Sequence, residues 1–153
     1  SCGNKQIAFP ENCLTFDTPS GKALKVACVF HGSLAFEYDG KVIQVDPVTQ
    51  MGEMTIDYSA FGKADAIFIT HSHPDHLCPP AIDTLSSEKT LLYGNAESVA
   101  ALGRGSVLAN GNWPEESATW LSLHITPPQA GKYSTRRVMA MDISLISMDS
   151  GYM

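Results

Sequence analysis

Three histidines and one aspartate lie within six residues of this 153-residue chain: His71, His73, Asp75 and His76. Imidazole nitrogens and carboxylate oxygens are protein ligands that zinc binds at about 2.0–2.2 Å. His71 and His73 are two positions apart and can project together, while Asp75 and His76 can face a second position nearby. Two metal ions about 3.5–4 Å apart can hold a bridging hydroxide and polarise a scissile bond. The cluster therefore predicts a site for one or two divalent ions, whereas a solvated polar loop is the alternative.

A short apolar segment must position this cluster. Residues 64–70 are nearly all apolar, which is typical of a strand covered on both faces. The end of that strand would fix His71, and the tight loop would turn the other side chains back toward the same point. Upstream, residues 24–30, 34–38 and 41–45 are predicted strands, and Asp39-Gly40 predicts a type I′ hairpin between the last two.

Strand and helix patterns alternate downstream of the cluster. The predicted elements are a helix beginning at Pro79-Pro80 with Ile82 and Leu85 on one face, a strand at 89–93, a helix from the cap Asn95 to Leu102, and strands at 106–109 and 118–126. Residues 48–63 are expected to form a loop. This order favours an α/β fold whose ligand site lies at strand ends.

Composition narrows the classes of function. Hydrophobic residues make up 44% of the chain, which is enough for a core, and the length favours one domain. The net charge of −6 is opposite in sign to that of a protein that binds nucleic-acid phosphates, so we expect no nucleic-acid partner. Apolar runs stay well short of the roughly 18 residues that span a bilayer.

The cysteines suggest a location rather than a zinc ribbon, because none of the four is in CxxC spacing. Cys2-Gly3-Asn4-Lys5 resembles the mature start of a bacterial lipoprotein, in which the cysteine is acylated. A lipidated Cys2 would attach the chain to a membrane in the cell envelope or periplasm. An ordinary cysteine in a cytoplasmic protein is the alternative. Cys28 is expected in the core, and Cys78 is expected to be a buried bystander rather than a metal neighbour.

The motif His71-x-His73-x-Asp75-His76 after an apolar strand resembles the signature of the metallo-β-lactamase superfamily of metal-dependent hydrolases. His31-Gly32-Ser33, Asp39-Gly40-Lys41 and Val45-Asp46-Pro47 are similar to the branch that includes L-ascorbate-6-phosphate lactonase-like proteins. The resemblance covers about residues 22–126. It implies an α/β fold, the N-terminal half of an αββα sandwich, with a mixed β-sheet and flanking helices. The expected organisation is a tail at 1–22, this partial domain at 23–126 and an atypical tail at 127–153.

The resemblance also implies roles for the clustered residues. His71 and His73 would bind a first metal ion, and Asp75 and His76 a second. Asp75 would in addition hold or deprotonate the attacking water, which makes it the candidate catalytic residue. The expected cofactor is zinc, as one or two ions, although the same ligands accept Mn or Fe.

Two upstream residues have less specific assignments. His31 could contact the substrate or a group around the metal ligands, or be a structural residue of a turn. Asp46 could orient a metal-binding histidine or merely cap a turn. Both are expected near the pocket because the resemblance places their strand ends there.

The expected function is hydrolysis of a small-molecule ester, lactone, phosphoester or amide by a metal-bound hydroxide. A non-catalytic remnant that binds metal weakly or associates with another subunit is the alternative. It arises because the resemblance calls for a third histidine on the first metal, a bridging aspartate and a late histidine, none of which is visible. His124, the remaining histidine, lies within a predicted strand. A sandwich lacking its second half would expose an apolar face and favour self-association.

The tail from about residue 127 suggests an explanation for the missing motifs. In the frame that joins the third base of one codon to the next two, Met139-Ala140, Met141-Asp142 and Met148-Asp149 all force glycine codons. The same frame permits a His-Pro motif and an Asp-Gly hairpin. We therefore expect this segment to be an out-of-frame translation, which the coding DNA can decide.

Overall fold

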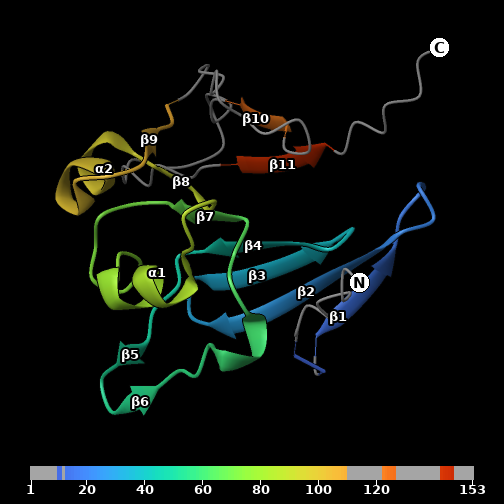
Figure 1. The fold of residues 1–153 in the computed structure, drawn as a ribbon, viewed down its shortest axis with the longest axis horizontal. Coiled ribbons are helices and arrows are strands. Elements are labelled where there is room, and N and C mark those ends of the chain that lie inside the picture. Colours follow the sequence, from blue (N-terminus) through green and yellow to red (C-terminus); the bar gives the residue numbers. More distant parts are fainter. Residues whose placement is uncertain (1–9, 12, 110–121, 127–141, 147–153) are drawn as a thin grey trace, which may run out of the picture.

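The computed structural model describes residues 10, 11, 13–109, 122–126 and 142–146 (Figure 1). Within these residues, seven strands form one sheet in the order β1-β2-β3-β4-β7-β8-β9. The first four are antiparallel neighbours: β1 (Leu14–Asp17), β2 (Ala23–Phe30), β3 (Ser33–Tyr38) and β4 (Lys41–Val45). The last three continue from β4 in parallel: β7 (Ala66–Ile69), β8 (Leu91–Gly94) and β9 (Ser106–Val107). The sheet is therefore mixed, as predicted.

Short helices and two small hairpin-like sheets complete the described part. The helices are the 3-10 helix η1 (Ser59–Phe61), α1 (Pro79–Leu85) and α2 (Ala96–Leu102). The small antiparallel pairs are β5 (Gln50–Met51) with β6 (Met54–Thr55), and β10 (Ser122–Thr126) with β11 (Asp142–Ile146). These elements confirm the α/β class. None of the described helices has the length and hydropathy of a membrane-crossing segment.

The two faces of the sheet carry separate apolar clusters. One face packs against α1 and the segment before β7, and its buried residues include Ile67, Ile69, Ile82 and Leu85. The opposite face buries a second set, namely Ile43, Val45, Ala66, Phe68, Tyr93 and Leu108. All four residues of β7 are buried, which is why its sequence is apolar without alternation. Each large side chain buried in this way contributes about 1.5–3 kcal/mol, so β7 is a firm base for the loop that follows it.

Several local predictions are confirmed. Asp39 and Gly40 both have positive φ angles, +50° and +74°, as a type I′ hairpin requires. The side chain of Asn95 accepts a hydrogen bond from the Ser98 N–H at 2.8 Å and so caps α2. In α1, Ile82 and Leu85 are fully buried, on the face assigned to them.

Other local predictions need correction. Residues 14–17 are strand β1, because they pair with β2 across the turn at 18–21, and not part of an unstructured tail. Cys28 is exposed, because the alternation of β2 turns its neighbour Ala27 inward. The expected loop 48–63 contains the β5–β6 pair and η1. The expectation of an atypical tail at 127–153 stays a prediction: residues 142–146 form β11, and 127–141 and 147–153 lie outside the described residues.

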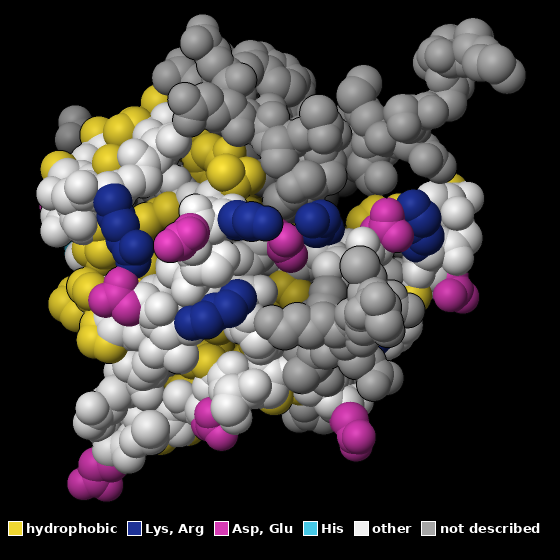
Figure 2. All heavy atoms as spheres, viewed as in Figure 1, with side chains coloured by type: hydrophobic (Ala, Val, Ile, Leu, Met, Phe, Trp, Pro, Cys, Tyr) yellow, Lys and Arg dark blue, Asp and Glu magenta, His cyan; other side chains and the backbone are white. Residues whose placement is uncertain are grey.

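Charged side chains of both signs are mixed over the described part of the face in Figure 2. Several of them are paired across neighbouring strands or elements: Lys22 with Asp39, Lys25 with Glu37, Lys41 with Asp65, and Arg104 with Asp83. Such exposed pairs contribute about 0–1 kcal/mol each. They therefore matter less to the position of the histidine loop than the buried strand β7.

Candidate metal centre

Three chain segments meet at one edge of the sheet. Since β4 and β7 are parallel neighbours, Asp46 at the end of β4 lies beside the start of the histidine loop, residues 71–76, at the end of β7. The β3–β4 pairing places Leu34 opposite Val45, which brings the β2–β3 turn at residues 31–32 to the same edge. The pairing of the strands thus brings the β2–β3 turn, Asp46 and the histidine loop together, although they are far apart in the sequence.

Asp46 is the centre of a hydrogen-bond network. Its side chain is only 2% exposed. One carboxylate oxygen accepts the backbone N–H of Thr70 at 2.7 Å, and the other accepts the Thr70 hydroxyl at 2.6 Å and lies 2.7 Å from Nδ1 of His76. The backbone of Asp46 has a φ of +45°, and its carbonyl accepts a hydrogen bond from the Ser33 hydroxyl. Asp46 therefore does more than end a strand, because it connects β3, β4 and the histidine loop.

This network determines which ring nitrogens of two histidines carry a proton. A carboxylate only accepts hydrogen bonds, so Nδ1 of His76 must donate to Asp46. The Thr70 hydroxyl has one proton, which it donates to Asp46, so it must accept from Nδ1 of His71, 3.0 Å away. When these rings are neutral, Nε2 therefore carries the lone pair, which is the form that binds a metal ion.

Replacing Thr70 with valine should lower the affinity of the site for Zn²⁺ by about 10–100-fold, the usual cost of losing a group that orients a ligand. Valine has nearly the same shape but cannot accept the His71 proton, so the His71 ring is free to turn or to change tautomer. Isothermal titration with Zn²⁺ measures the effect, and Thr70→Ser is the matched control. Equal affinities for the valine and serine variants would contradict this role of the hydroxyl.

The ligand atoms converge in two groups that share one carboxylate. Single atoms from His71, His73 and Asp75 lie within 4.8 Å of one another, and so do single atoms from His31, Asp75 and His76. The ring centroids of His71 and His73 are 4.6 Å apart, and those of His71 and His76 are 3.9 Å apart. The nitrogen and oxygen donors of each group fit a divalent ion such as zinc. Asp75 stands between the two groups.

The electrostatics of the cluster favour the ligand forms of its members. Partial burial, together with repulsion from His76 and His73, holds the pKa of the His71 imidazole below its ordinary value of 6.5. For Asp75, desolvation opposes ionisation, but a hydrogen bond within the residue and the nearby His76 and His31 outweigh it, so the pKa of this carboxyl is lowered. At neutral pH the first is a neutral imidazole and the second a carboxylate.

The β2–β3 turn approaches the cluster closely. His31 has a φ of +51°, and its Nε2 lies 3.1 Å from Oδ2 of Asp75. A Cβ atom on Gly32 would lie 2.7 Å from Cε1 of His76, which is too close for any larger residue unless the His76 ring moved. Glycine at this position lets the turn pack directly on the ring.

The structure brings together all the residues singled out from the sequence: His71, His73, Asp75 and His76, with His31 and Asp46 beside them. The prediction divided the ligands into two pairs, whereas Asp75 belongs to both groups of ligand atoms. Sequence reasoning missed Thr70 and Gly32. The position of Thr70 next to His71 was the available signal, because a hydroxyl at that point can reach a ring nitrogen.

Other candidates lie apart from these groups or outside the described residues. Cys78 is partly buried, packs against the core, and places its Sγ 3.4 Å from the Thr49 hydroxyl. Within the described residues it belongs to neither ligand group. Cys2 and most of the segment assigned to an altered frame lie outside the described residues, and His124 lies in β10.

Known proteins share this architecture. A family model described as a beta-lactamase superfamily domain matches residues 25–137. A crystal structure of a protein named as a metal-dependent hydrolase, from Parabacteroides distasonis ATCC 8503, is similar with 41% identity and a TM-score of 0.67 over 75% of this chain. Igni18, a metallo hydrolase from the archaeon Ignicoccus hospitalis KIN4/I, shares the fold with 21% identity and a TM-score of 0.56 over 81% of this chain. No curated protein matches the chain.

The chain spans 50% and 56% of the lengths of those two proteins. The family match covers most of the sequence, from the third residue of β2 through β9, and includes the whole histidine loop. It agrees with a mixed sheet whose strand ends bring histidines and carboxylates together. This chain therefore belongs to the metallo-β-lactamase superfamily and has the fold of its N-terminal half.

Proposed function

We propose that this chain is a metal-dependent hydrolase that acts on a small-molecule ester, lactone, phosphoester or amide. The observation that carries the proposal is the convergence of His71, His73 and Asp75, whose ligand atoms lie within 4.8 Å of one another. A solvated loop would have no reason to turn these side chains toward one point. Membership of a superfamily of metal-dependent hydrolases supports the same function.

Each clustered residue has a distinct task in this proposal. His71 and His73 would offer ring nitrogens to a first ion and His76 would offer Nε2 to a second, while the Asp75 carboxylate belongs to both groups of ligand atoms. Asp46 and Thr70 hold the rings of His71 and His76 in the orientation that exposes Nε2. A divalent ion held there would lower the pKa of water and stabilise negative charge that develops on the substrate.

Asp75 is the proposed catalytic residue. A carboxyl is ionised at neutral pH, and the lowered pKa of Asp75 extends the ionised form to more acidic solutions. An ionised carboxylate can accept a hydrogen bond from the attacking water and orient it. With 42% of its side chain exposed, solvent and substrate can reach it. Zinc is the proposed ion because the donors are imidazole nitrogens and a carboxylate, although these donors also accept Mn or Fe.

Metal depletion and reconstitution of the purified chain test the function. After treatment with a chelator, the chain is loaded with Zn²⁺, Mn²⁺ or Fe²⁺ and assayed with one chromogenic substrate for each bond class. We expect tight, stoichiometric binding and hydrolysis of at least one class, both lost in His71→Ala/His73→Ala. The exposed Glu53→Gln is the control for a change of charge outside the cluster. Binding weaker than micromolar without turnover would instead support a non-catalytic remnant.

A further inference from the structure

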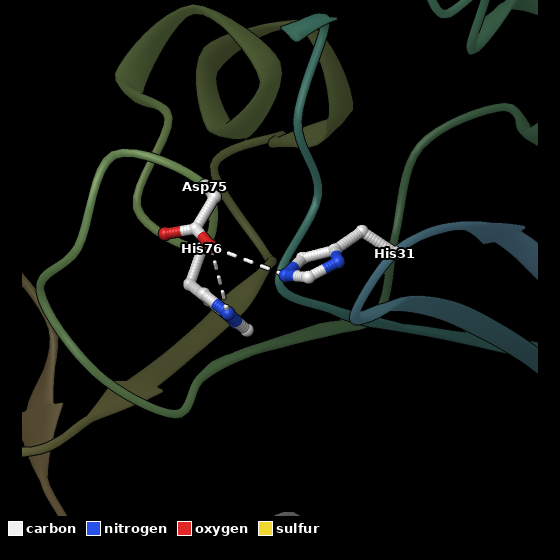
Figure 3. Close-up of side chains that lie close together, drawn as sticks. All are labelled: His31, Asp75 and His76. Atoms are coloured by element: carbon white, nitrogen blue, oxygen red, sulfur yellow. Dashed lines mark hydrogen bonds and ion pairs between the residues drawn. The ribbon is translucent and has the colours of Figure 1, made fainter.

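We propose that His31 is the third protein ligand of the second ion, together with Asp75 and His76. This inference rests on the proposed function, since it completes the same site. Nε2 of His31 lies 3.1 Å from Oδ2 of Asp75, and Nε2 of His76 lies 3.5 Å from that same oxygen (Figure 3). The three side chains come from two loops that are 44 residues apart in sequence and point toward a common centre.

The separations have the size that a zinc site requires. Ligand atoms bound tetrahedrally at about 2.0–2.2 Å from zinc lie roughly 3.4 Å from one another. The distances of 3.1 Å and 3.5 Å from Asp75 to the two rings bracket that value. All three ligand atoms also lie within 4.8 Å of one another, so only small movements would place an ion between them.

The hydrogen bond to Asp46 selects the tautomer of the neutral His76 ring that this site needs. Its Nδ1 is committed to Asp46 at 2.7 Å, so the free lone pair is on Nε2, the atom nearer to Asp75. Three nitrogen and oxygen ligands leave a fourth position open, as catalytic zinc sites do. The imidazole of His31 is 51% exposed and the Asp75 side chain 42%, so solvent and substrate can reach this group.

The backbone around His31 is compatible with this assignment. His31 has a φ of +51°, in the left-handed region that Gly, Asn, Asp and His adopt more often than other residues. Asp39, in the next hairpin along the chain, has a similar φ of +50°. Gly32 adds to the argument, because its missing Cβ lets the turn reach the His76 ring.

Titration of the full chain with Co²⁺, followed by absorption and by calorimetry, tests the assignment. His31→Gly relieves the backbone and removes the ligand, whereas His31→Gln lacks the imidazole but carries an amide N–H about as far from Cβ as Nε2 and so keeps a donor for Asp75. We expect two ions in the unmodified chain. In both variants the second ion should bind more than about 100-fold more weakly, a larger loss than for a group that only orients a ligand. Asp39→Asn, at an equivalent backbone position, should keep both ions.

The outcomes separate this inference from the proposed function. An unmodified chain that binds no ion tightly contradicts the proposed function and this inference together. If the unmodified chain binds two ions and both His31 variants bind them with the same affinities, the inference alone is overturned. Recovery of the second ion in His31→Gln but not in His31→Gly also overturns it, since a hydrogen bond to Asp75 would then be the contribution of His31. Melting curves without metal show whether each variant is folded.

Discussion

Replacing His73 with alanine should weaken binding of the first ion by more than about 100-fold, because losing a ligand costs more than losing a group that orients one. The free energy of unfolding should change by no more than about 0.5 kcal/mol. The side chain of His73 is exposed, so alanine leaves no cavity. His71 and Asp75 would remain as the other donors of the group. Few substitutions in this chain combine so large an effect on a ligand with so small an effect on folding.

Calorimetric titration with Zn²⁺ and chemical unfolding without metal provide the two measurements. Ser72→Ala is the matched control, because Ser72 lies next to His73 in the same loop. An unchanged Zn²⁺ affinity in His73→Ala would remove His73 from the site, and a large loss of stability would mean that its role is structural. Hydrolysis by His73→Ala should fall in parallel with the occupancy of the first ion. It should not return at metal concentrations that fill only the second group, His31, Asp75 and His76.

Exchanging Asp46 for asparagine should damage both ion sites at once. The amide has the same shape and tolerates a φ of +45°, but its NH₂ group would face two donors, the Thr70 hydroxyl and Nδ1 of His76. To accept from the amide, His76 must move its proton to Nε2, and the Thr70 hydroxyl must turn toward His71 and force the same change there. Both rings then lose the lone pair that binds metal. We expect affinity losses of about 10–100-fold at each ion and about 1–3 kcal/mol of destabilisation.

Nitrogen NMR of the histidine rings measures this change directly, because the two tautomers have distinct nitrogen shifts. The unmodified chain should show protonated Nδ1 in His71 and His76, and Asp46→Asn should show protonated Nε2. Asp65→Asn is the control, since Asp65 also accepts a backbone N–H, that of Val42 at 2.9 Å, away from the site. Unchanged tautomers in Asp46→Asn would mean that the carboxylate does not set them, whatever happens to stability.

The sequence was sufficient to predict the histidine loop and the strand before it. Both depend on local patterns: four ligands in six residues, and an apolar run that needs cover on both faces. The hairpin at Asp39-Gly40 and the cap Asn95 are local as well, and the structure confirms them. Predictions that depend on neighbours within a few residues thus succeeded because the physics that determines them acts over the same range.

The features that could not be predicted from the sequence depend on contacts between segments that are far apart in the chain. Asp46 meets Thr70 only because β4 and β7 are adjacent and parallel, a pairing that no local pattern specifies. The edge strand β1 was missed although its sequence Leu-Thr-Phe-Asp alternates apolar and polar residues, because four exposed residues in a polar, turn-rich segment give only a weak strand signal. Cys28 was misplaced for a related reason, since an apolar run does not show which of its residues faces the core.

The network around Asp46 has a consequence for how fast an ion can bind. Zinc fingers must order their chain around the metal, and much of the binding free energy is spent on that ordering. Here, the rings of His71 and His76 are held by Thr70 and Asp46 within the folded protein, so little rotational entropy is lost on capture. We therefore expect metal uptake to be limited by diffusion and dehydration of the ion, with amide hydrogen exchange in β4 and β7 nearly the same before and after loading.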